Sequence, residues 1–334
     1  MRIGIDLMGS DNSPSILFEG VLQAALQNTD PITFVAFGTP QAIEPLGSVV
    51  VQSSLQARIE FHTAEEVIFM NEDPLAALRL KKDSSLLVGM RLLKSGYLDA
   101  FVCAGNTGAV IAASKVALHM LPGIRRPALL ALLPTRNKTI AIIDAGGNVR
   151  NTLESILQYT CMGIAYQRGC CGIEIPMVGL LNNGTESYKG TLPLRQAFAK
   201  LENLSLSGKP QKFHFVGNIE ARELFDGNID LLITDGFTGN VLLKTAEGTA
   251  AFILDCFAKS SQDPTSIAAL QKSFHYTEYP GALVCGIDKI VVKCHGNASK
   301  QSIFSAILSA IAFSEKKLIK MMRNDLVTSN ILNG

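Results

Sequence analysis

One rhythm recurs along this chain and limits what it can fold into. A short apolar run leads into a turn of Gly, Asn or Asp, and a helical pattern follows. Repeated parallel strands need such helical crossovers, so the rhythm predicts an α/β fold with a mostly parallel sheet and helices on both faces. Seven runs carry it: RIGIDL, DAFVC, TIAIIDAGGN, PMVGLLNNGT, FHFVGN, DLLITDGFTGN and KIVVKCHGNAS.

The helices expected after these turns follow from the 3.6-residue spacing of their apolar positions. They are Ile16–Leu26, a helix through Ala117, Thr152–Met162, Pro193–Leu201, IEARELF, Val241–Ala258 and Gln301–Phe313. Three stretches look like surface connections: Gly38–Ser54, Ser205–Lys212 and Ser260–Pro264. Since no clean linker separates the segments, we expect one three-layer α/β/α unit. Its two interlaced lobes are roughly residues 1–115 with 280–334, and residues 116–279.

Charge and cysteine content exclude several classes of protein. The 334 residues include 30 basic and 29 acidic side chains, which does not favour nucleic-acid binding by the molecule as a whole. Seven cysteines without a C-x-x-C motif fit reduced thiols and no zinc site. The first residues lack the apolar core of a secretory signal, and the apolar run 303–313 is too short to span a bilayer. We therefore expect a cytoplasmic protein.

The common cofactor motifs are missing. The sequence has no G-x-G-x-x-G at a strand–helix turn, no Walker A loop, no G-x-S-x-G and no H-E-x-x-H. Its five histidines show no metal-ligand spacing. We expect neither a cofactor nor a metal.

Two similar turns, AGNTGA and DGFTGN, are the clearest candidates for a binding site. Each follows a buried strand, and the carboxyl ends of parallel strands share one edge of a sheet. Glycines let the backbone approach a ligand, and helix N-termini suit an anion, so the turns predict a phosphate site. The alternative is that they are ordinary turn and capping residues. The candidates are Asn106, Thr107, Gly108, Asp235, Gly236, Thr238 and Gly239.

Charged residues near the turns are further candidates. Lys189 and Lys244 could supply cations to a bound anion, Lys244 one helical turn after Asn240. His295, beside the Gly of KCHGNAS, could polarise a carbonyl or move a proton. Asp6 and Asp11 flank the first turn, where Asp11 could simply cap the following helix. For each residue a purely structural or solvated role is the alternative.

Seven longer motifs occur together in this chain: IDLMGSDNSP, DSSLLVGMRLLKSGYLDAFVCAGNTGA, GIRRPALLALLP, LLNNGTESYKG, VGNIEAREL, TDGFTGNVLLKTAEG and YPGALVCGIDKIVVKCHG. In this order, nearly end to end, they resemble the phosphate acyltransferase family of bacterial phospholipid synthesis. The resemblance implies a homodimer with a Rossmann-like fold related to isocitrate and isopropylmalate dehydrogenases and to phosphotransacetylase. It also implies that acyl-[acyl-carrier-protein] and inorganic phosphate react to give acyl phosphate. A membrane glycerol-3-phosphate acyltransferase would consume that product.

Together with the two similar turns, this resemblance implies roles for individual residues. Asn106, Thr107, Thr238 and Asn240 would hold phosphate, and Lys189 or His295 would face the thioester carbonyl oxygen. An acidic carrier protein would need a basic surface. The candidate segments are Arg79–Lys82, Arg125–Arg126 and EKKLIKMMR at 315–323.

The chain departs from the family in two places. Arg150, in GGNVRN, replaces an acid of the family's G-A-N-V-D. The segment Lys259–Tyr276 is short and nearly neutral where the family has a long, membrane-contacting hairpin, so peripheral membrane association stays open. The alternatives are a phosphotransacetylase-like enzyme that uses acyl-CoA, a decarboxylating dehydrogenase on the related fold, and a non-enzymatic phosphate or acyl sensor.

Overall fold

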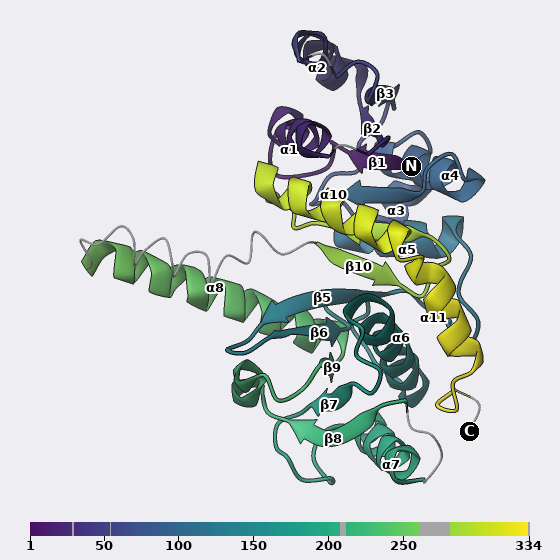
Figure 1. Ribbon diagram of the computed structural model, residues 1–334, viewed down its shortest axis with the longest axis vertical. Coiled ribbons are helices and arrows are strands. Elements are labelled where there is room, and N and C mark those ends of the chain that lie inside the picture. Colours follow the sequence, from purple (N-terminus) through teal and green to yellow (C-terminus); the bar gives the residue numbers. More distant parts are fainter. Residues whose placement is uncertain (29, 54, 208–211, 261–280, 333–334) are drawn as a thin grey trace. The chain divides into compact units, whose positions relative to one another are not determined.

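The chain divides into two compact units, each of which is described by itself. The computed structural model describes residues 1–28, 30–53, 55–207, 212–260 and 281–332 (Figure 1). Unit 1 comprises Met1–Ala128 with Pro280–Thr328, and unit 2 comprises Leu129–Tyr279 with Ser329–Gly334. The sequence places the first lobe boundary earlier, near residue 115, and assigns residues 329–334 to the other lobe.

The sheet of unit 1 is parallel except for one pair of strands. Its strand order is β3-β2-β1-β4-β11-β10, and only β10 runs antiparallel, against β11. The carboxyl ends of β1, β4 and β11 are therefore neighbours. The strands are β1 (Arg2–Asp6), β2 (Thr33–Gly38), β3 (Ile59–Thr63), β4 (Ala100–Cys103), β10 (Ala282–Cys285) and β11 (Ile290–Lys293).

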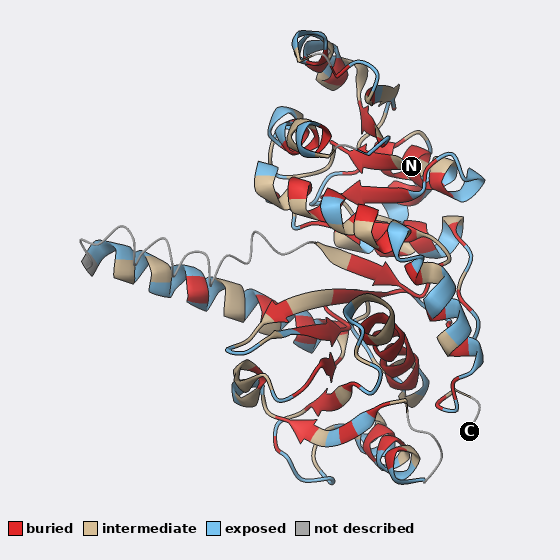
Figure 2. Ribbon diagram, in the orientation of Figure 1, coloured by how far each residue is buried: buried red, intermediate tan, exposed pale blue. Residues whose placement is uncertain are grey.

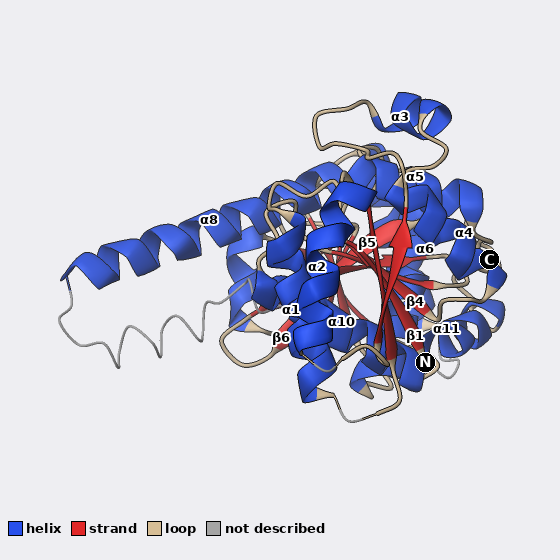
Figure 3. Ribbon diagram, turned by 90° about the horizontal axis from the view of Figure 1, so that it is seen from above, coloured by secondary structure: helices blue, strands red, loops and turns tan. Residues whose placement is uncertain are grey.

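Helices cover both faces of this sheet. Helix α10 lies on β1, β4 and β11 and against α1, while α4 lies on β1, β2 and β4 and against α5. Figure 3 shows α1 and α10 on one side of the strands, with α4 and α5 on the other. The helices of unit 1 are α1 (Pro14–Gln27), α2 (Pro40–Gln52), α3 (Pro74–Leu80), α4 (Ser85–Ser95), α5 (Thr107–Ala117), α10 (Lys300–Glu315) and α11 (Leu318–Val327).

Unit 2 repeats the layered plan. Its strand order is β5-β6-β9-β7-β8, parallel except for the β5–β6 pair, and α6 packs on β6 and β9. The strands are β5 (Ala128–Pro134), β6 (Thr139–Ile143), β7 (Met177–Leu181), β8 (His214–Ile219) and β9 (Leu231–Ile233). The helices are α6 (Leu153–Cys171), α7 (Leu192–Leu206), the 3₁₀ helix η1 (Ala221–Asp226) and α8 (Gly236–Ser260).

The strands form the core of each unit, as the buried colouring in Figure 2 shows. Apolar side chains fill it from both faces, which is why these strands lack the alternation of a half-exposed sheet. Helix α6 is buried from Ile156 to Gln167. A capping box formed by Thr152 and Ser155 starts this helix, and Gly172, with φ 70°, ends it.

The mostly parallel α/β architecture predicted from the sequence is confirmed, with specific corrections. The stretch Gly38–Ser54 is not a surface connection, because α2 occupies most of it and buries Ile43, Leu46 and Val50. The segment IEARELF forms only a 3₁₀ turn, η1. The expected connection at Ser205–Lys212 begins inside α7, and most of Ser260–Pro264 and of Lys259–Tyr276 lies outside the described residues.

Candidate functional site

In unit 1, three of the glycine-bearing turns meet. They follow β1, β4 and β11, whose carboxyl ends are neighbours in the sheet. The Ser10 hydroxyl donates to the Gly296 carbonyl at 2.6 Å, and the Asp11 N–H donates to the same oxygen at 2.8 Å. A Cβ added at Gly9 would lie 3.5 Å from the Gly105 Cα, so these two turns touch through their backbones. We call this group of turns the unit 1 cluster.

Asn106 is occupied by structural hydrogen bonds. Its side-chain oxygen accepts from Ala109 N at 3.1 Å, which makes it the N-cap of α5. Its amide nitrogen donates to the carbonyls of Met70 at 3.2 Å and Glu72 at 3.1 Å. The capping alternative therefore applies to Asn106. Thr107 begins α5 and is half-buried, and Gly108 follows it at the surface.

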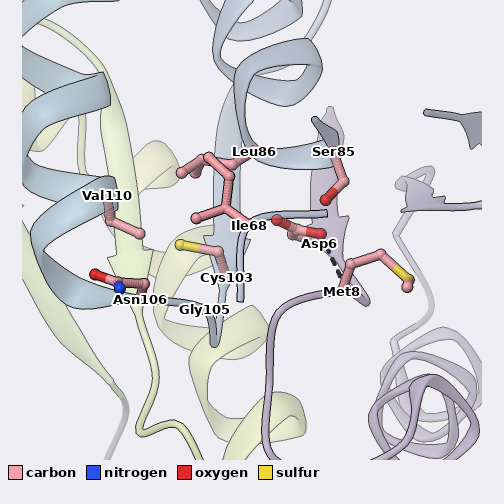
Figure 4. A pocket seen from close by; sticks show the side chains of 9 residues that line it. All are labelled: Asp6, Met8, Ile68, Ser85, Leu86, Cys103, Gly105, Asn106 and Val110. Carbon is pink, nitrogen blue, oxygen red and sulfur yellow. Dashed lines mark hydrogen bonds between the residues drawn. The ribbon is translucent and has the colours of Figure 1, made fainter. Parts of the chain in front are cut away.

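A buried carboxyl lies behind this cluster. Asp6 is 3% exposed at the end of β1 and accepts hydrogen bonds from Met8 N at 3.0 Å and from the Ser85 side chain. Burial raises the pKa of Asp6 to about 7, and the two hydrogen bonds oppose the shift. The carboxyl lines a cavity of about 10 Å³, room for one water molecule, together with Cys103, Gly105 and Asn106 (Figure 4).

The other candidates in unit 1 lie near these turns. Asp11 is exposed and does not cap α1, whose N-cap is Ser13. His295 is exposed in the turn after β11. Its neighbour Cys294 is buried, and burial raises the pKa of that thiol to about 12, which keeps it protonated and unsuited to nucleophilic attack.

In unit 2, two turns interlock after the neighbouring parallel strands β6 and β9. The Gly236 N–H donates to the Asn148 carbonyl at 2.8 Å. A Cβ added at Gly239 would lie 2.1 Å from the Asp144 carbonyl oxygen, and one at Gly146 would lie 3.5 Å from Asn240. Only glycine at 236 and 239 allows this approach. We call this pair of turns the unit 2 cluster.

Asp144 organises the unit 2 cluster and was not among the residues predicted from the sequence. Its fully buried carboxylate accepts from the N–H groups of Leu129 at 3.0 Å, Gly146 at 3.2 Å and Gly147 at 2.7 Å. The Asn148 amide adds a fourth bond at 2.8 Å. Burial raises the pKa of Asp144, while these bonds act in the opposite direction. The available signal was its position, because Asp6, Asp144 and Asp235 all stand where a strand gives way to glycine.

Asp235 and Thr238 form a local pair. The Asp235 carboxylate accepts from Thr238 N at 2.8 Å and from the Thr238 hydroxyl at 2.7 Å. A negative charge therefore already lies at the N-terminus of α8, where it interacts favourably with the helix dipole. Both polar groups of Thr238 are engaged by this pair. Asn240 is exposed one turn into the helix.

The lysine candidates of unit 2 differ in setting. Lys244 is exposed and pairs with Glu247 at 3.0 Å along the same helix. Lys189 lies in the loop after β7, where the Asn182 amide donates to its carbonyl at 3.2 Å. Its ammonium is 5.7 Å from the centre of the Tyr188 ring. Arg150 is exposed after the turn that follows β6.

A groove opens beside the unit 2 cluster. It encloses about 720 Å³, within the range typical of small-molecule sites. We call it the unit 2 groove. Its lining residues are Leu181, Asn182, Asn183, Gly190, Thr191, Leu194, Ala221, Asp235, Thr238, Val241, Leu242 and Thr245.

The candidates thus fall into two groups. Unit 1 brings together Asp6, Asp11, Asn106, Thr107, Gly108 and His295, and unit 2 holds Lys189, Asp235, Gly236, Thr238, Gly239, Asn240 and Lys244. That both groups serve one site stays a prediction. In the part of the chain that the structure describes, no three His, Cys, Asp or Glu side chains could hold a metal ion. No helix among the described residues has the length and apolarity that a bilayer crossing needs.

Comparison with solved structures shows a shared fold. A branched-chain phosphotransacylase from Enterococcus faecalis superimposes with a TM-score of 0.62 at 12% identity, covering 94% of this chain and 99% of that one. A putative 4-hydroxythreonine-4-phosphate dehydrogenase from Salmonella typhimurium gives 0.54 at 11% identity, covering 93% and 98%.

Sequence comparison is more specific. A family model described as a fatty acid synthesis protein matches residues 1–321. The phosphate acyltransferase of Chlamydia pneumoniae is 36% identical over 330 residues, covering 98% of this chain and 99% of that protein. The phosphate acyltransferase of Caldanaerobacter subterraneus is 38% identical over 322 residues, covering 93% and 92%. With the fold and these relatives in agreement, the chain belongs to the phosphate acyltransferase family of fatty acid synthesis proteins.

Proposed function

We propose that this protein transfers a fatty acyl group reversibly from acyl-[acyl-carrier-protein] to inorganic phosphate and so forms acyl phosphate. The observation that carries the proposal is the gathering of glycine- and asparagine-bearing turns at the carboxyl ends of parallel strands in each unit. Ligands of such sheets bind at this edge. The names of the relatives supply the reaction class.

The chemistry makes modest demands on the protein. A phosphate oxygen attacks the thioester carbonyl carbon, a C–O bond forms, and the C–S bond breaks as the carbonyl re-forms. A free thiol has a pKa near ~8.5, so the thiolate leaves without obligatory protonation. Stabilising the oxyanion is then the main task, since one such donor is typically worth ~10²–10³-fold in rate.

We assign the holding of phosphate to Asn240 and Thr107, with the adjoining turn N–H groups. Asp235 positions Thr238, because both polar groups of Thr238 donate to it. Asn106 acts through its cap, which fixes the start of α5. Lys189 or His295 faces the carbonyl oxygen, where a cation or a donor lowers the energy of the developing charge.

We also propose the partners that this reaction requires. The acyl donor is an acidic carrier protein, and the product serves a membrane glycerol-3-phosphate acyltransferase in phospholipid synthesis. The protein itself works in the cytoplasm as a homodimer, with peripheral membrane association open to test. Gel filtration with light scattering tests the dimer, and sedimentation with phospholipid vesicles tests the association.

The decisive experiment incubates the protein with palmitoyl-[acyl-carrier-protein] and phosphate and detects palmitoyl phosphate by mass spectrometry. Palmitoyl-CoA in a parallel reaction distinguishes a phosphotransacetylase-like donor. Binding of phosphate without product from either donor would instead support a sensor and overturn the proposal.

A second measurement tests the phosphate site. Asn240→Ala should raise the KM for phosphate by roughly tenfold or more, because a hydrogen bond to a charged group contributes about 1.5–3 kcal/mol. Asn228→Ala is the control, since Asn228 is also an exposed asparagine of unit 2 but precedes β9. An unchanged phosphate KM in Asn240→Ala would remove Asn240 from the site.

A further inference from the structure

We propose that the unit 2 groove binds the acyl chain of the thioester substrate and sets the chain length that the enzyme prefers. The inference rests on the proposed function, which it deepens. It assigns a substrate site to residues outside the glycine turns: Leu181, Leu194, Ala221, Val241 and Leu242.

One wall of the groove is a stripe along α8. Thr238, Val241, Leu242 and Thr245 stand at positions i, i+3, i+4 and i+7 and therefore share one face of that helix. Val241 leaves 47% of its surface exposed, a large fraction for a branched apolar side chain that a ligand could cover.

The other apolar lining residues come from three further elements. Leu181 ends β7, Leu194 lies in the first turns of α7, and Ala221 begins η1. These side chains offer methyl and methylene surface, which favours a hydrocarbon chain over a sugar or a nucleotide.

The groove presents almost no charge to a ligand. Among the described residues that line it there is no lysine, arginine, histidine or glutamate, and Asp235 is the one ionisable side chain. Because the Asp235 carboxylate is engaged by Thr238, it caps α8 rather than facing the groove as a bare charge. An uncharged apolar ligand fits this wall best.

Four of the six polar lining residues follow the ends of β7 and β9: Asn182, Asn183, Asp235 and Thr238. The other two are Thr191 and Thr245. Asn182 and Asn183 follow β7, and the Asn182 amide holds the Lys189 carbonyl at 3.2 Å, next to Gly190. At Gly190, with φ 83°, an added Cβ would lie 2.6 Å from the Asn182 side chain, so glycine allows this close approach. The thioester would lie at this polar end, and the chain would run along α8 toward Thr245.

This arrangement predicts a length-dependent affinity. Each methylene transferred from water to the groove should strengthen binding about fourfold until the groove is filled. Beyond that length the affinity should level off, because additional methylenes stay in water.

Displacement of cis-parinaric acid tests the groove without turnover. In the unmodified protein, saturated fatty acids from hexanoate to palmitate should bind progressively more tightly and then reach a plateau. Ala221→Phe should move the plateau to a shorter acid by filling part of the groove. Val241→Glu should weaken palmitate binding by about tenfold or more, because it places a charge against the chain.

Matched controls separate the groove from the general surface. Ile253→Glu introduces the same charge on α8 at a residue that is also 47% exposed but lies outside the groove, and Ala199→Phe is the counterpart on α7. Both controls should bind fatty acids as the unmodified protein does. Circular dichroism confirms that each variant is folded.

Two results would overturn the inference: palmitate binding no tighter than hexanoate, or equal weakening by Val241→Glu and Ile253→Glu. Acyl phosphate formation is measured separately. Product with an unaltered chain-length profile in both groove variants removes the groove assignment and leaves the proposed function standing. Length-dependent binding without product supports the groove assignment and overturns the proposed function.

Discussion

The unit 1 and unit 2 clusters are built from the same sequence pattern, yet the described spaces that they border differ in size. In both, an aspartate stands at the end of a buried strand or directly after it, and a glycine turn follows: Asp6 in one and Asp144 in the other. Behind the unit 1 cluster is a cavity of about 10 Å³, whereas a groove of about 720 Å³ opens beside the unit 2 cluster. Among the described residues, the aspartate of the unit 1 turn therefore borders a water-sized cavity, whereas the turn after β9 in unit 2 borders a ligand-sized groove.

The two aspartates also differ in the number of hydrogen bonds that they accept. Asp144 accepts four hydrogen bonds, three of them from the backbone, and so fixes the turn that α8 packs against. Asp6 accepts one bond from the backbone and one from Ser85, and its cavity has room for a water molecule. Asp144 thus has a larger structural role than Asp6.

Removing the two carboxyls is the strongest test of the comparison. Asp144→Ala should lower the free energy of unfolding by on the order of 4 kcal/mol, since it leaves several buried donors without an acceptor. Asp6→Ala should cost only about 1 kcal/mol. Urea denaturation measures both, with Asp144→Asn as the milder control. Equal costs at the two positions would show that the clusters do not differ in this way.

The next largest contrast in stability is expected between Gly105 of the AGNTGA turn and Gly236 of the DGFTGN turn. A Cβ at Gly236 would lie 2.6 Å from the Asn148 carbonyl oxygen, while one at Gly105 has no neighbour closer than 3.8 Å. Gly236→Ala should therefore cost about 3 kcal/mol of unfolding free energy, and Gly105→Ala less than about 1 kcal/mol. Thermal and urea unfolding report both.

Gly248 supplies the control for that pair. It lies within α8 with nothing within 4 Å of an added Cβ, so Gly248→Ala should stabilise the protein by about 0.5–1 kcal/mol. A stable Gly236→Ala variant would mean that the unit 2 turns tolerate separation.

The pH dependence of stability distinguishes Asp6. Its pKa is raised from 3.8 in the unfolded chain to about 7 in the folded protein, so between these values the folded state holds a proton that the unfolded chain has lost. Stability from this group is therefore lost as pH rises through this window, by at most about 1.4 kcal/mol for each pH unit. Asp6→Asn should flatten the dependence. If the variant and the unmodified protein have the same slope in urea denaturation from pH 4 to 7, Asp6 is already ionised there.

Lys244 should give the smallest effect. Its pair with Glu247 is exposed, so Lys244→Ala should change the unfolding free energy by less than about 0.5 kcal/mol. Lys115→Ala, on exposed α5 surface of unit 1, is the matched variant. A cost above 1 kcal/mol for Lys244 alone would show that it supports the unit 2 cluster.

Much of the fold could be predicted because strand and helix periodicity is local. The turns after β1, β4, β6, β7, β9 and β11 are visible as apolar runs that end in Gly, Asn or Asp. The segment that forms α2 was missed because Pro40, Pro45 and Gly47 suggest a loop, yet tertiary contacts bury Ile43, Leu46 and Val50. Packing overrode a weak local preference.

The candidate site could be predicted only in part. The glycine turns were visible, but the hydrogen-bond partners that occupy Asn106 and Thr238 were not. The Asn106 amide, for example, donates to the carbonyls of Met70 and Glu72, which are distant from it in the sequence. The groove was not visible either, because Leu181, Leu194, Ala221 and Val241 come from four separate elements.

The sequence by itself determined the succession of strand, turn and helix, the family, and the places where glycine is required, because each depends on neighbours along the chain. Only the tertiary structure decided which aspartate is surrounded by donors, which turns interlock and where an apolar groove opens. Those outcomes depend on contacts between segments that are distant in the sequence, and a local sequence pattern does not specify such contacts.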